Sequence, residues 1–363
     1  MKKTISSLLL LLAFLISCND SQSQNNQIKR GDNMDTRVFQ IYPNIEMKKV
    51  RFKNRFGIEI VGDLYLPENY NSKKNPAIVI SGPFGAVKEQ ASGLYAQEMA
   101  TYGFVTLAFD PSFTGESGGE IRNTASPDIF TEDYSAAVDY LGLLSYVDRE
   151  RIGAIGICGL SGMAITAALT DTRIKAVATL SMYDMSRDMS KGHMDYYTKE
   201  QREKIKKYLS EQRWKDAENG NYALGSHEPT FDENNEILAS AMIVPDELPE
   251  NADPVFASFY NYYAKRAYHP RAINFVTSWV ATMPISFLNF TLMSNIKDAS
   301  TTPILLIAGD RAHSRYYSED VYKEILGPKE LLIIEDADHV DLYDNMEKIP
   351  FEKLKEFFNS NLK

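Results

Sequence analysis

The sequence predicts an α/β fold in which a mostly parallel central sheet of about eight strands carries helices on both faces and is interrupted by a mainly helical insertion. From residue 48, short apolar runs alternate with segments of helical periodicity, the order that builds a parallel sheet covered by helices. The alternation stops near residue 184 and resumes near residue 300. With 363 residues and 44% hydrophobic content, the chain can bury a core of this size.

The strands are predicted by apolar runs bounded by turn-forming residues. The first two, at 50–52 and 58–66, have the pattern of an antiparallel pair. The third, at 76–80, is continuously apolar, as expected of a central strand buried on both faces. Further strands are predicted at 104–109, 152–157, 174–180, 303–308 and 331–334, and helices at 90–102, 127–144, 163–169, 318–326 and 347–361.

The interruption at residues 184–300 has a different composition. It contains a charged amphipathic helix at 199–214 and a segment at 255–293 that is crowded with aromatic side chains. Aromatic density at helical spacing is more often core than binding surface. A stretch of this length between two strands must nevertheless lie over an edge of the sheet. We therefore predict a mainly helical cap, some of whose aromatic residues line a pocket beneath it.

The N-terminal segment predicts export and lipid attachment. Residues 1–17 begin with two lysines, continue with an apolar run and end in Ser17, the order of a signal peptide. The run is shorter than the roughly 20 apolar residues that span a bilayer, so a retained anchor is the weaker alternative. Leu15-Ile16-Ser17-Cys18 resembles the lipobox of bacterial lipoproteins. The resemblance implies a lipid on Cys18 that anchors the protein to a membrane of the bacterial cell envelope, on its periplasmic or surface side; an ordinary signal peptide is the alternative.

The domain boundaries follow from these segments. Residues 19–33 are rich in Asn, Gln and Ser and cannot bury enough apolar surface to offset chain entropy. A lipidated Cys18 would leave Cys158, the second of two cysteines, without an intramolecular partner, so either reactivity or packing explains it. We expect a signal peptide at 1–17, a tether at 18–45, a core formed by 46–183 and 301–363, and a cap at 184–300.

Charge and motif content argue against several classes of protein. The net charge of -10 disfavours nucleic-acid binding, which requires a basic face. The sequence contains no internal repeat, no heptad series and no CxxC or HExxH motif. We therefore predict no nucleic-acid partner, no metal and no cofactor.

Cys158 directly follows the predicted strand at 152–157, within the run Gly156-Ile157-Cys158-Gly159. A tight strand-to-helix turn needs small neighbours, because the backbone of a nucleophile there is strained and its side chain must project free of the sheet. This run resembles the nucleophile elbow of α/β-hydrolases, and the resemblance extends from about residue 48 to residue 363. Because it has cysteine in place of serine, this run is similar to the elbow of the dienelactone hydrolase-like branch, which reads G-x-C-x-G-G.

One departure from that pattern leaves a rival nucleophile. The second residue after Cys158 is Leu160 rather than glycine, and the small pair Ser161-Gly162 follows one step late. An elbow centred on Ser161 would place that residue in the first helical turn, so Cys158 is favoured. A thiol at Cys158 would gain reactivity from the helix N-terminus, which lowers a thiol pKa, and from an imidazole that accepts its proton.

The resemblance implies a histidine after the last strand and an acid after the strand before it. His339 lies in the loop that leaves the predicted strand at 331–334 and is the candidate base, with a surface histidine as the alternative. Asp310 follows the strand at 303–308 and is the candidate acid, which would hold the imidazole tautomer. In many relatives the acid lies two or three residues past the glycine, whereas Asp310 follows Gly309 at once. Other candidates are Glu319 and Asp338 as substitute acids and His313 as a second pocket residue.

An oxyanion hole needs two backbone N–H groups, one from the residue after the nucleophile and one from the loop after the third strand. Gly159 supplies the first. The second is expected from the run Ser81-Gly82-Pro83-Phe84-Gly85. Because Pro83 has no N–H, Phe84 is the better candidate and Gly85 the reserve.

These residues together imply a hydrolase that acts on an ester, a lactone or a thioester. A Cys158-His339-Asp310 triad would work through an acyl-cysteine intermediate, with the amides of Phe84 and Gly159 binding the oxyanion. The expected partner is a small-molecule acyl substrate. Two alternatives remain open. One is an acyltransferase that uses the same intermediate, and the other is a non-catalytic envelope lipoprotein that binds a ligand.

Overall fold

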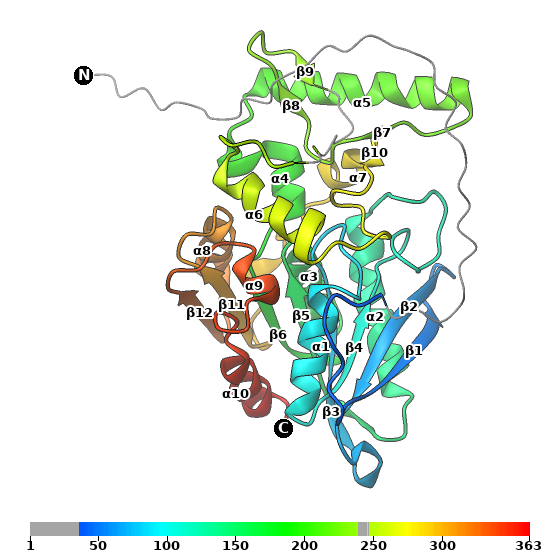
Figure 1. The fold of residues 1–363 in the computed structure, drawn as a ribbon, viewed down its shortest axis with the longest axis vertical. Coiled ribbons are helices and arrows are strands. Elements are labelled where there is room, and N and C mark those ends of the chain that lie inside the picture. Colours follow the sequence, from blue (N-terminus) through cyan, green and yellow to red (C-terminus); the bar gives the residue numbers. More distant parts are fainter. Residues whose placement is uncertain (1–35, 239–244, 246) are drawn as a thin grey trace.

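The structure is a computed structural model that describes residues 36–238, 245 and 247–363 (Figure 1). Its centre is one large sheet, formed by β1 (Glu46–Lys53), β2 (Glu59–Leu66), β3 (Asn75–Ser81), β4 (Val105–Phe109), β5 (Val147–Ile157), β6 (Ile174–Leu180), β11 (Ile304–Gly309) and β12 (Lys329–Ile334). The order of its eight strands is β1-β2-β4-β3-β5-β6-β11-β12. β2 pairs antiparallel with both β1 and β4, and all other neighbours are parallel.

The predicted fold class is confirmed. The sheet has eight strands, is mostly parallel, and each predicted strand overlaps an observed one. Every residue of β4 is buried, and β3 is buried except at Pro76, because helices cover the sheet on both sides. Continuous apolar runs therefore identified the central strands correctly.

Helices cover both faces of the sheet. α2 (Pro127–Gly142), α3 (Leu160–Thr170) and α8 (Arg315–Glu324) pack on one face, and α1 (Ala91–Thr101), α9 (Asp341–Asp344) and α10 (Phe351–Asn361) belong to the core of the other. α10 begins later than predicted, since Pro350 disfavours a helical conformation in the residue before it. α3 begins earlier than predicted, because the turn after β5 leads directly into it.

The described residues of 184–300, which we call the cap, form a mainly helical layer over the carboxyl ends of the strands, at the top of Figure 1. Its helical elements are α4 (Met185–Lys191), η2 (His193–Asp195), α5 (Lys199–Asn219), α6 (Pro254–Tyr260), the π-helical η3 (Asn261–Arg266), α7 (Pro284–Leu288) and η4 (Ile296–Asp298). Its short strands are β7 (Leu224–Gly225), β8 (Thr230–Phe231), β9 (Ile237–Leu238) and β10 (Trp279–Val280). Outside the cap, the short 3-10 helix η1 (Tyr70–Ser72) lies between β2 and β3.

A buried ion-pair network fixes the loop after β3 and ties the cap to the core. The Nζ atom of Lys88 lies 2.8 Å from a carboxylate oxygen of Glu89, 3.1 Å from one of Asp110 and 2.6 Å from one of Glu116. Arg271 of the cap pairs with the same Glu89. Charges are buried in proteins only when they are paired in this way. The network therefore positions the segment that leads from β3 into α1.

The N-terminal predictions lie outside the described residues. The signal peptide at 1–17 and Cys18 are not among them, and of the tether only residues 36–45 are described. Within the described chain, no helix is long and apolar enough to cross a membrane. Lipid attachment at Cys18 therefore stays a prediction.

Candidate active site

Cys158 lies in the turn between β5 and α3, at the carboxyl end of the sheet. Its φ of 56° is a left-handed value that is strained for a residue with a Cβ. The neighbouring glycines allow this tight turn. A Cβ at Gly156 would lie 2.6 Å from Cα of Ser161, and a Cβ at Gly159 would lie 2.6 Å from Cβ of Phe84. The local sequence therefore forms the strained strand-to-helix turn that a nucleophile elbow requires.

The Cys158 thiol is buried, with 8% of the residue exposed. Burial raises the pKa of this thiol to about 11, against opposing hydrogen bonds from the Tyr343 hydroxyl and the backbone amides of Phe84 and Gly159. The expectation of a lowered thiol pKa is therefore wrong, because the cost of burying a thiolate outweighs the hydrogen bonds that stabilise it. At pH 7 the sulfur is a neutral thiol.

The rival nucleophile, Ser161, is turned into the fold. It lies in the first turn of α3, is fully buried, and its hydroxyl donates a hydrogen bond of 2.9 Å to the carbonyl oxygen of Gly156. This bond closes the turn around Cys158. The placement of Ser161 thus gives it a structural task and leaves Cys158 as the candidate nucleophile at the turn.

Phe84 lies in the loop after β3, and its backbone amide, like that of Gly159, lowers the pKa of the Cys158 thiol. Gly82 lets the loop come this close, because a Cβ there would lie 2.2 Å from the carbonyl oxygen of Ile157. The cap holds the loop from the other side. Asn274 donates a hydrogen bond of 2.6 Å from Nδ2 to the carbonyl oxygen of Phe84. Both amides predicted for an oxyanion hole are thus brought to one point.

His339 is buried, with 1% of the residue exposed. Its Nδ1 lies 2.6 Å from Oγ of Ser314, and its Nε2 lies 2.8 Å from the hydroxyl oxygen of Tyr343. Burial, and then the neighbouring His313, hold the pKa of His339 well below its ordinary value. The imidazole is therefore neutral at pH 7 and has one N–H to donate and one nitrogen that accepts.

The structure corrects the predicted acid. Asp310 accepts a hydrogen bond of 3.2 Å from the backbone amide of Ala337, and in the described chain no hydrogen bond joins its carboxylate to His339. The substitute acids are also occupied elsewhere, since Glu319 pairs with Arg315 and Asp338 accepts hydrogen bonds from the hydroxyl of Ser258 and from nearby backbone amides. The serine hydroxyl of Ser314 occupies the place at Nδ1 that an acid was expected to fill.

Sequence reasoning misses Ser314 and Tyr343. Tyr343 follows His339 by four residues, the spacing that brings side chains together around a helical turn, and α9 provides that turn. This spacing could have identified it. Ser314 lies in an irregular loop after β11, where no periodicity predicts which side chain reaches the imidazole.

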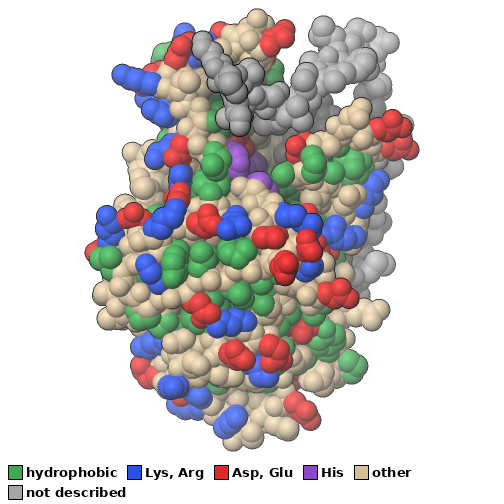
Figure 2. Space-filling view, turned by 90° about the vertical axis from the view of Figure 1, so that its left-hand side faces the viewer, with side chains coloured by type: hydrophobic (Ala, Val, Ile, Leu, Met, Phe, Trp, Pro, Cys, Tyr) green, Lys and Arg blue, Asp and Glu red, His purple; other side chains and the backbone are tan. Residues whose placement is uncertain are grey.

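His313 lies beside His339, as a second pocket residue would. The two ring centroids are 4.8 Å apart, and Nε2 of His313 lies 2.5 Å from the hydroxyl oxygen of Tyr183. Burial lowers the pKa of His313 to about 4. A third ring, that of His193, lies 5.9 Å from His313 between centroids. Figure 2 shows histidine side chains at the surface in a hollow on one side of the molecule.

A cluster of a histidine and two acidic residues belongs to the cap. One ligand-type atom each from Asp188, His227 and Glu228 lies within 4.8 Å of the others, the one such group among the described residues. Asp188 accepts a hydrogen bond of 2.7 Å from the hydroxyl of Tyr317. Burial raises the pKa of Asp188 to about 6, and burial together with the charge of Asp188 raises that of Glu228 to about 8. These three residues could hold a divalent cation, and the expectation of no metal stays a prediction.

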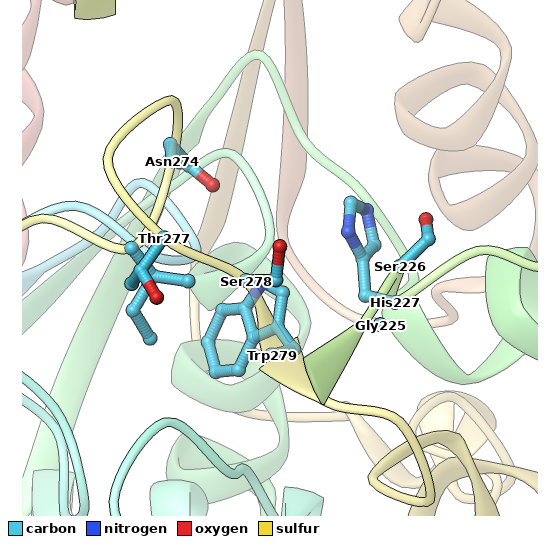
Figure 3. Close-up of a pocket in the computed structure, with 8 residues that line it drawn as sticks. Gly225, Ser226, His227, Asn274, Thr277, Ser278 and Trp279 are labelled. Carbon is cyan, nitrogen blue, oxygen red and sulfur yellow. The ribbon is translucent and has the colours of Figure 1, made fainter. Parts of the chain in front are cut away.

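A small pocket adjoins the loop that carries Phe84. Figure 3 shows His227, which follows β7, and Trp279, which lies on the paired strand β10, with Asn274 across from them. The indole of Trp279 stacks on the ring of Phe84 at 4.3 Å between centroids, and the ring of His227 lies 6.0 Å from that of Phe84. An aromatic wall with a few polar groups is the usual lining of a small-molecule site.

The chain is similar over most of its length to two uncharacterized bacterial proteins. The chain is 49% identical over 360 residues to the uncharacterized protein PA2218 of Pseudomonas aeruginosa, covering 97% of this chain and 92% of that one. The crystal structure of PA2218 matches with a TM-score of 0.83 and 51% identity over 93% of this chain and all of the other. The uncharacterized protein YcjY of Escherichia coli is 34% identical over 300 residues, or 82% of this chain and 92% of YcjY. No family model matches the chain.

More distant matches give the fold and partial similarity. The α/β hydrolase GrgF from Penicillium sp. sh18 has a TM-score of 0.69 at 19% identity, over 87% of this chain and 99% of GrgF, which shows a shared fold. A fungal protein named thiohydrolase aneE, from Aspergillus aculeatus, is 34% identical over 132 residues, only 36% of this chain and 40% of its own. The chain therefore belongs to the family of PA2218 and YcjY, and it has the α/β-hydrolase fold.

Proposed function

We propose that this protein transfers the acyl group of an ester, a lactone or a thioester to Cys158 and then releases it to water. One observation carries the proposal. Cys158 lies in a strained turn with a φ of 56°, and the loop that carries Phe84 packs against that turn, so that the backbone amides of Phe84 and Gly159 lie beside the thiol and lower its pKa. Amides so placed would stabilise the oxygen of a carbonyl that the sulfur attacks. His339 lies in the loop after β12, at the same edge of the sheet, and would act as the base.

The acylation step starts from neutral groups. Because the thiol pKa is raised and the His339 pKa is lowered, the two do not form an ion pair at pH 7. The thiol therefore loses its proton as its sulfur attacks the carbonyl carbon, and His339 gains a proton. The carbonyl oxygen becomes an oxyanion between the amides of Phe84 and Gly159. Ser314 accepts from Nδ1 and holds the imidazole orientation, the task predicted for Asp310.

Deacylation completes the cycle. The tetrahedral intermediate collapses, the bond to the leaving oxygen or sulfur breaks, and the proton on His339 passes to that leaving group. Water then attacks the acyl-cysteine with the same base, which yields a carboxylic acid and the free thiol of Cys158. An alcohol in place of water would give acyl transfer. Burial of Cys158 and His339 favours such a step because it limits access of bulk water.

A thioester is the favoured substrate class. The partial relative aneE is named a thiohydrolase, and a cysteine nucleophile exchanges one thioester for another with little change in bond energy. The dienelactone hydrolase-like branch, predicted from the elbow sequence, would instead favour a lactone. Both classes pass through the same acyl-cysteine, so the nucleophile can be tested before the substrate is known.

The test compares Cys158→Ala, Ser161→Ala and His339→Ala on p-nitrophenyl acetate and on an acetyl thioester whose released thiol is measured. Cys158→Ala and His339→Ala are expected to lose at least a hundredfold in kcat/KM, and Ser161→Ala to retain turnover once its folding is verified by circular dichroism. Mass spectrometry should detect an acetyl group on Cys158. Loss in Ser161→Ala with retention in Cys158→Ala would refute the proposal. No turnover by the unaltered protein would favour the non-catalytic alternative.

A further inference from the structure

Three side chains of metal-ligand type gather in the cap with no positive charge beside them. One imidazole nitrogen of His227 and one carboxylate oxygen each of Asp188 and Glu228 lie within 4.8 Å of one another. Arg187, the sequence neighbour of Asp188, pairs with two other acids, and among the described residues no lysine or arginine pairs with Asp188 or Glu228. Two carboxylates this close repel each other, so the pair requires either a shared proton or a bound cation.

The imidazole of His227 has no hydrogen-bonding partner in the described chain, and burial alone lowers its pKa, to about 4. The indole N–H of Trp279, which lines the same small pocket, is also buried without a partner among the described residues (Figure 3). Buried polar groups in proteins are almost always paired, and an exception indicates a water molecule or an ion. Two unpaired groups at one pocket therefore point to a polar ligand beside His227.

The two acids are held in place by hydrogen bonds. Asp188, which is 2% exposed, accepts one of 2.7 Å from the Tyr317 hydroxyl. Oγ of Ser226 accepts from the backbone N–H of Glu228 at 3.1 Å and donates to its carbonyl oxygen at 2.9 Å. The Tyr197 hydroxyl donates a bond of 2.6 Å to the carbonyl oxygen of the residue after Glu228. Partners that fix the ligands in this way are typical of metal sites.

We propose that Asp188, His227 and Glu228 bind a divalent cation, Zn²⁺ in preference to Mg²⁺, in a site separate from Cys158 and independent of the proposed chemistry. An imidazole with two carboxylates suits Zn²⁺, whereas Mg²⁺ prefers oxygen ligands alone. Ligand atoms in a tetrahedral zinc site lie about 3.4 Å apart, so small rotations of the three side chains would close them on the ion. A fourth position would remain for water or for a polar group of a ligand.

This site would replace the expectation of no metal. That expectation rested on the absence of CxxC and HExxH, motifs whose ligands lie close together in the sequence. Here Asp188 lies on α4, and the other two ligands follow β7. Only the packing of α4 against the segment after β7 brings the three side chains together.

The first test measures zinc binding directly. The protein would be freed of metal with EDTA, dialysed and titrated with ZnCl₂ in a calorimeter, where it should bind one Zn²⁺ per chain. Glu228→Gln and His227→Gln should each weaken binding by more than about a hundredfold, since loss of a supporting partner already costs 10- to 100-fold. No binding by the unaltered protein, or unchanged binding in both variants, would overturn the site.

Matched controls remove the same chemical groups nearby. Glu236→Gln takes a carboxylate from the same part of the cap, where it pairs with Lys204 at 2.9 Å. His193→Gln removes an imidazole whose ring lies beside that of His313. Both controls should bind Zn²⁺ as the unaltered protein does. Losses in the controls as large as those in the ligand variants would mean diffuse surface binding and would overturn the assignment.

A second test separates this site from the candidate nucleophile and base. Cys158 and His339 are also of zinc-ligand type, so Cys158→Ala would be titrated in the same way and should retain full binding. Loss of binding in Cys158→Ala with retention in Glu228→Gln would place the ion at the thiol and refute the proposal. Titration with MgCl₂ should give much weaker binding, and equal affinity for both cations would refute the imidazole as a ligand.

The third measurement uses stability and needs no substrate. A ligand that binds the folded state raises the melting temperature, so ZnCl₂ in place of EDTA should raise it for the unaltered protein and for Glu236→Gln. Glu228→Gln should melt at the same temperature in both, and an equal rise in this variant would overturn the site. Zinc binding without ester or thioester turnover would keep the site and refute the proposed function. Turnover without zinc binding would do the reverse.

Discussion

Replacing Ser314 tests whether a serine rather than an acid supports the base. The Ser314→Ala variant leaves Nδ1 of His339 without its partner at 2.6 Å in a site where His339 is 1% exposed. A buried polar group that loses its partner costs about 1–3 kcal/mol. If the cost falls on the transition state, kcat/KM drops roughly 5- to 150-fold. Loss of a triad aspartate would cost about ten-thousandfold.

The matched variant is Asp310→Asn, which keeps the side-chain size and removes the charge. Because Asp310 bonds to the amide of Ala337 and not to His339, its effect on kcat/KM should be smaller than that of Ser314→Ala. Both variants would be assayed on p-nitrophenyl acetate at equal folded fraction, which thermal melting verifies. A thousandfold loss in Asp310→Asn with near-normal turnover in Ser314→Ala would refute this reading of the site.

Two other predictions concern the oxyanion loop and the buried acids. In Gly159→Ala, a Cβ placed 2.6 Å from Cβ of Phe84 should push the loop away and lower kcat about 100-fold or more, with little change in KM. The control is Gly142→Ala, where the nearest atom to a new Cβ is 3.6 Å away, and its kinetics should match those of the unaltered protein. Equal kinetics in the two variants would contradict this prediction. The pKa of Glu228 is raised from 4.5 in the unfolded chain to about 8 in the folded protein. Between these two values the unfolded chain has already released the Glu228 proton while the folded protein keeps it. The free energy of unfolding therefore falls as pH rises from 4.5 to about 8, by at most about 1.4 kcal/mol per pH unit. Glu228→Gln should remove this part of the fall in urea denaturation at pH 5, 7 and 9, and an unchanged slope would contradict it.

Apolar pattern and chain order predict the sheet well, because a buried parallel strand must be apolar along its whole length. They also predict which side chains meet at the carboxyl edge, and the structure brings Cys158, Phe84, Gly159 and the loop of His339 together there. Position relative to a strand end is thus readable from sequence.

Side-chain direction within a loop is not readable in this way. Asp310 follows β11 directly and was expected at His339, yet local backbone amides draw its carboxylate to Ala337. Ser314, four residues later, reaches the imidazole because of the path of an irregular loop. The sign of the thiol pKa shift at Cys158 was missed for a related reason, since it depends on how completely the cap excludes water, and that is a property of tertiary packing.

The position of Phe84 bears on how this family could diversify. Its amide would serve the proposed chemistry at Cys158, while its carbonyl and its ring are held by Asn274 and Trp279 of the cap. An insertion that selects substrates is usually treated as a module that can be exchanged. Here a foreign cap would also have to supply the amide and indole that hold this loop. New specificity in this lineage would therefore arise by residue changes inside the existing cap more readily than by recombination of whole caps.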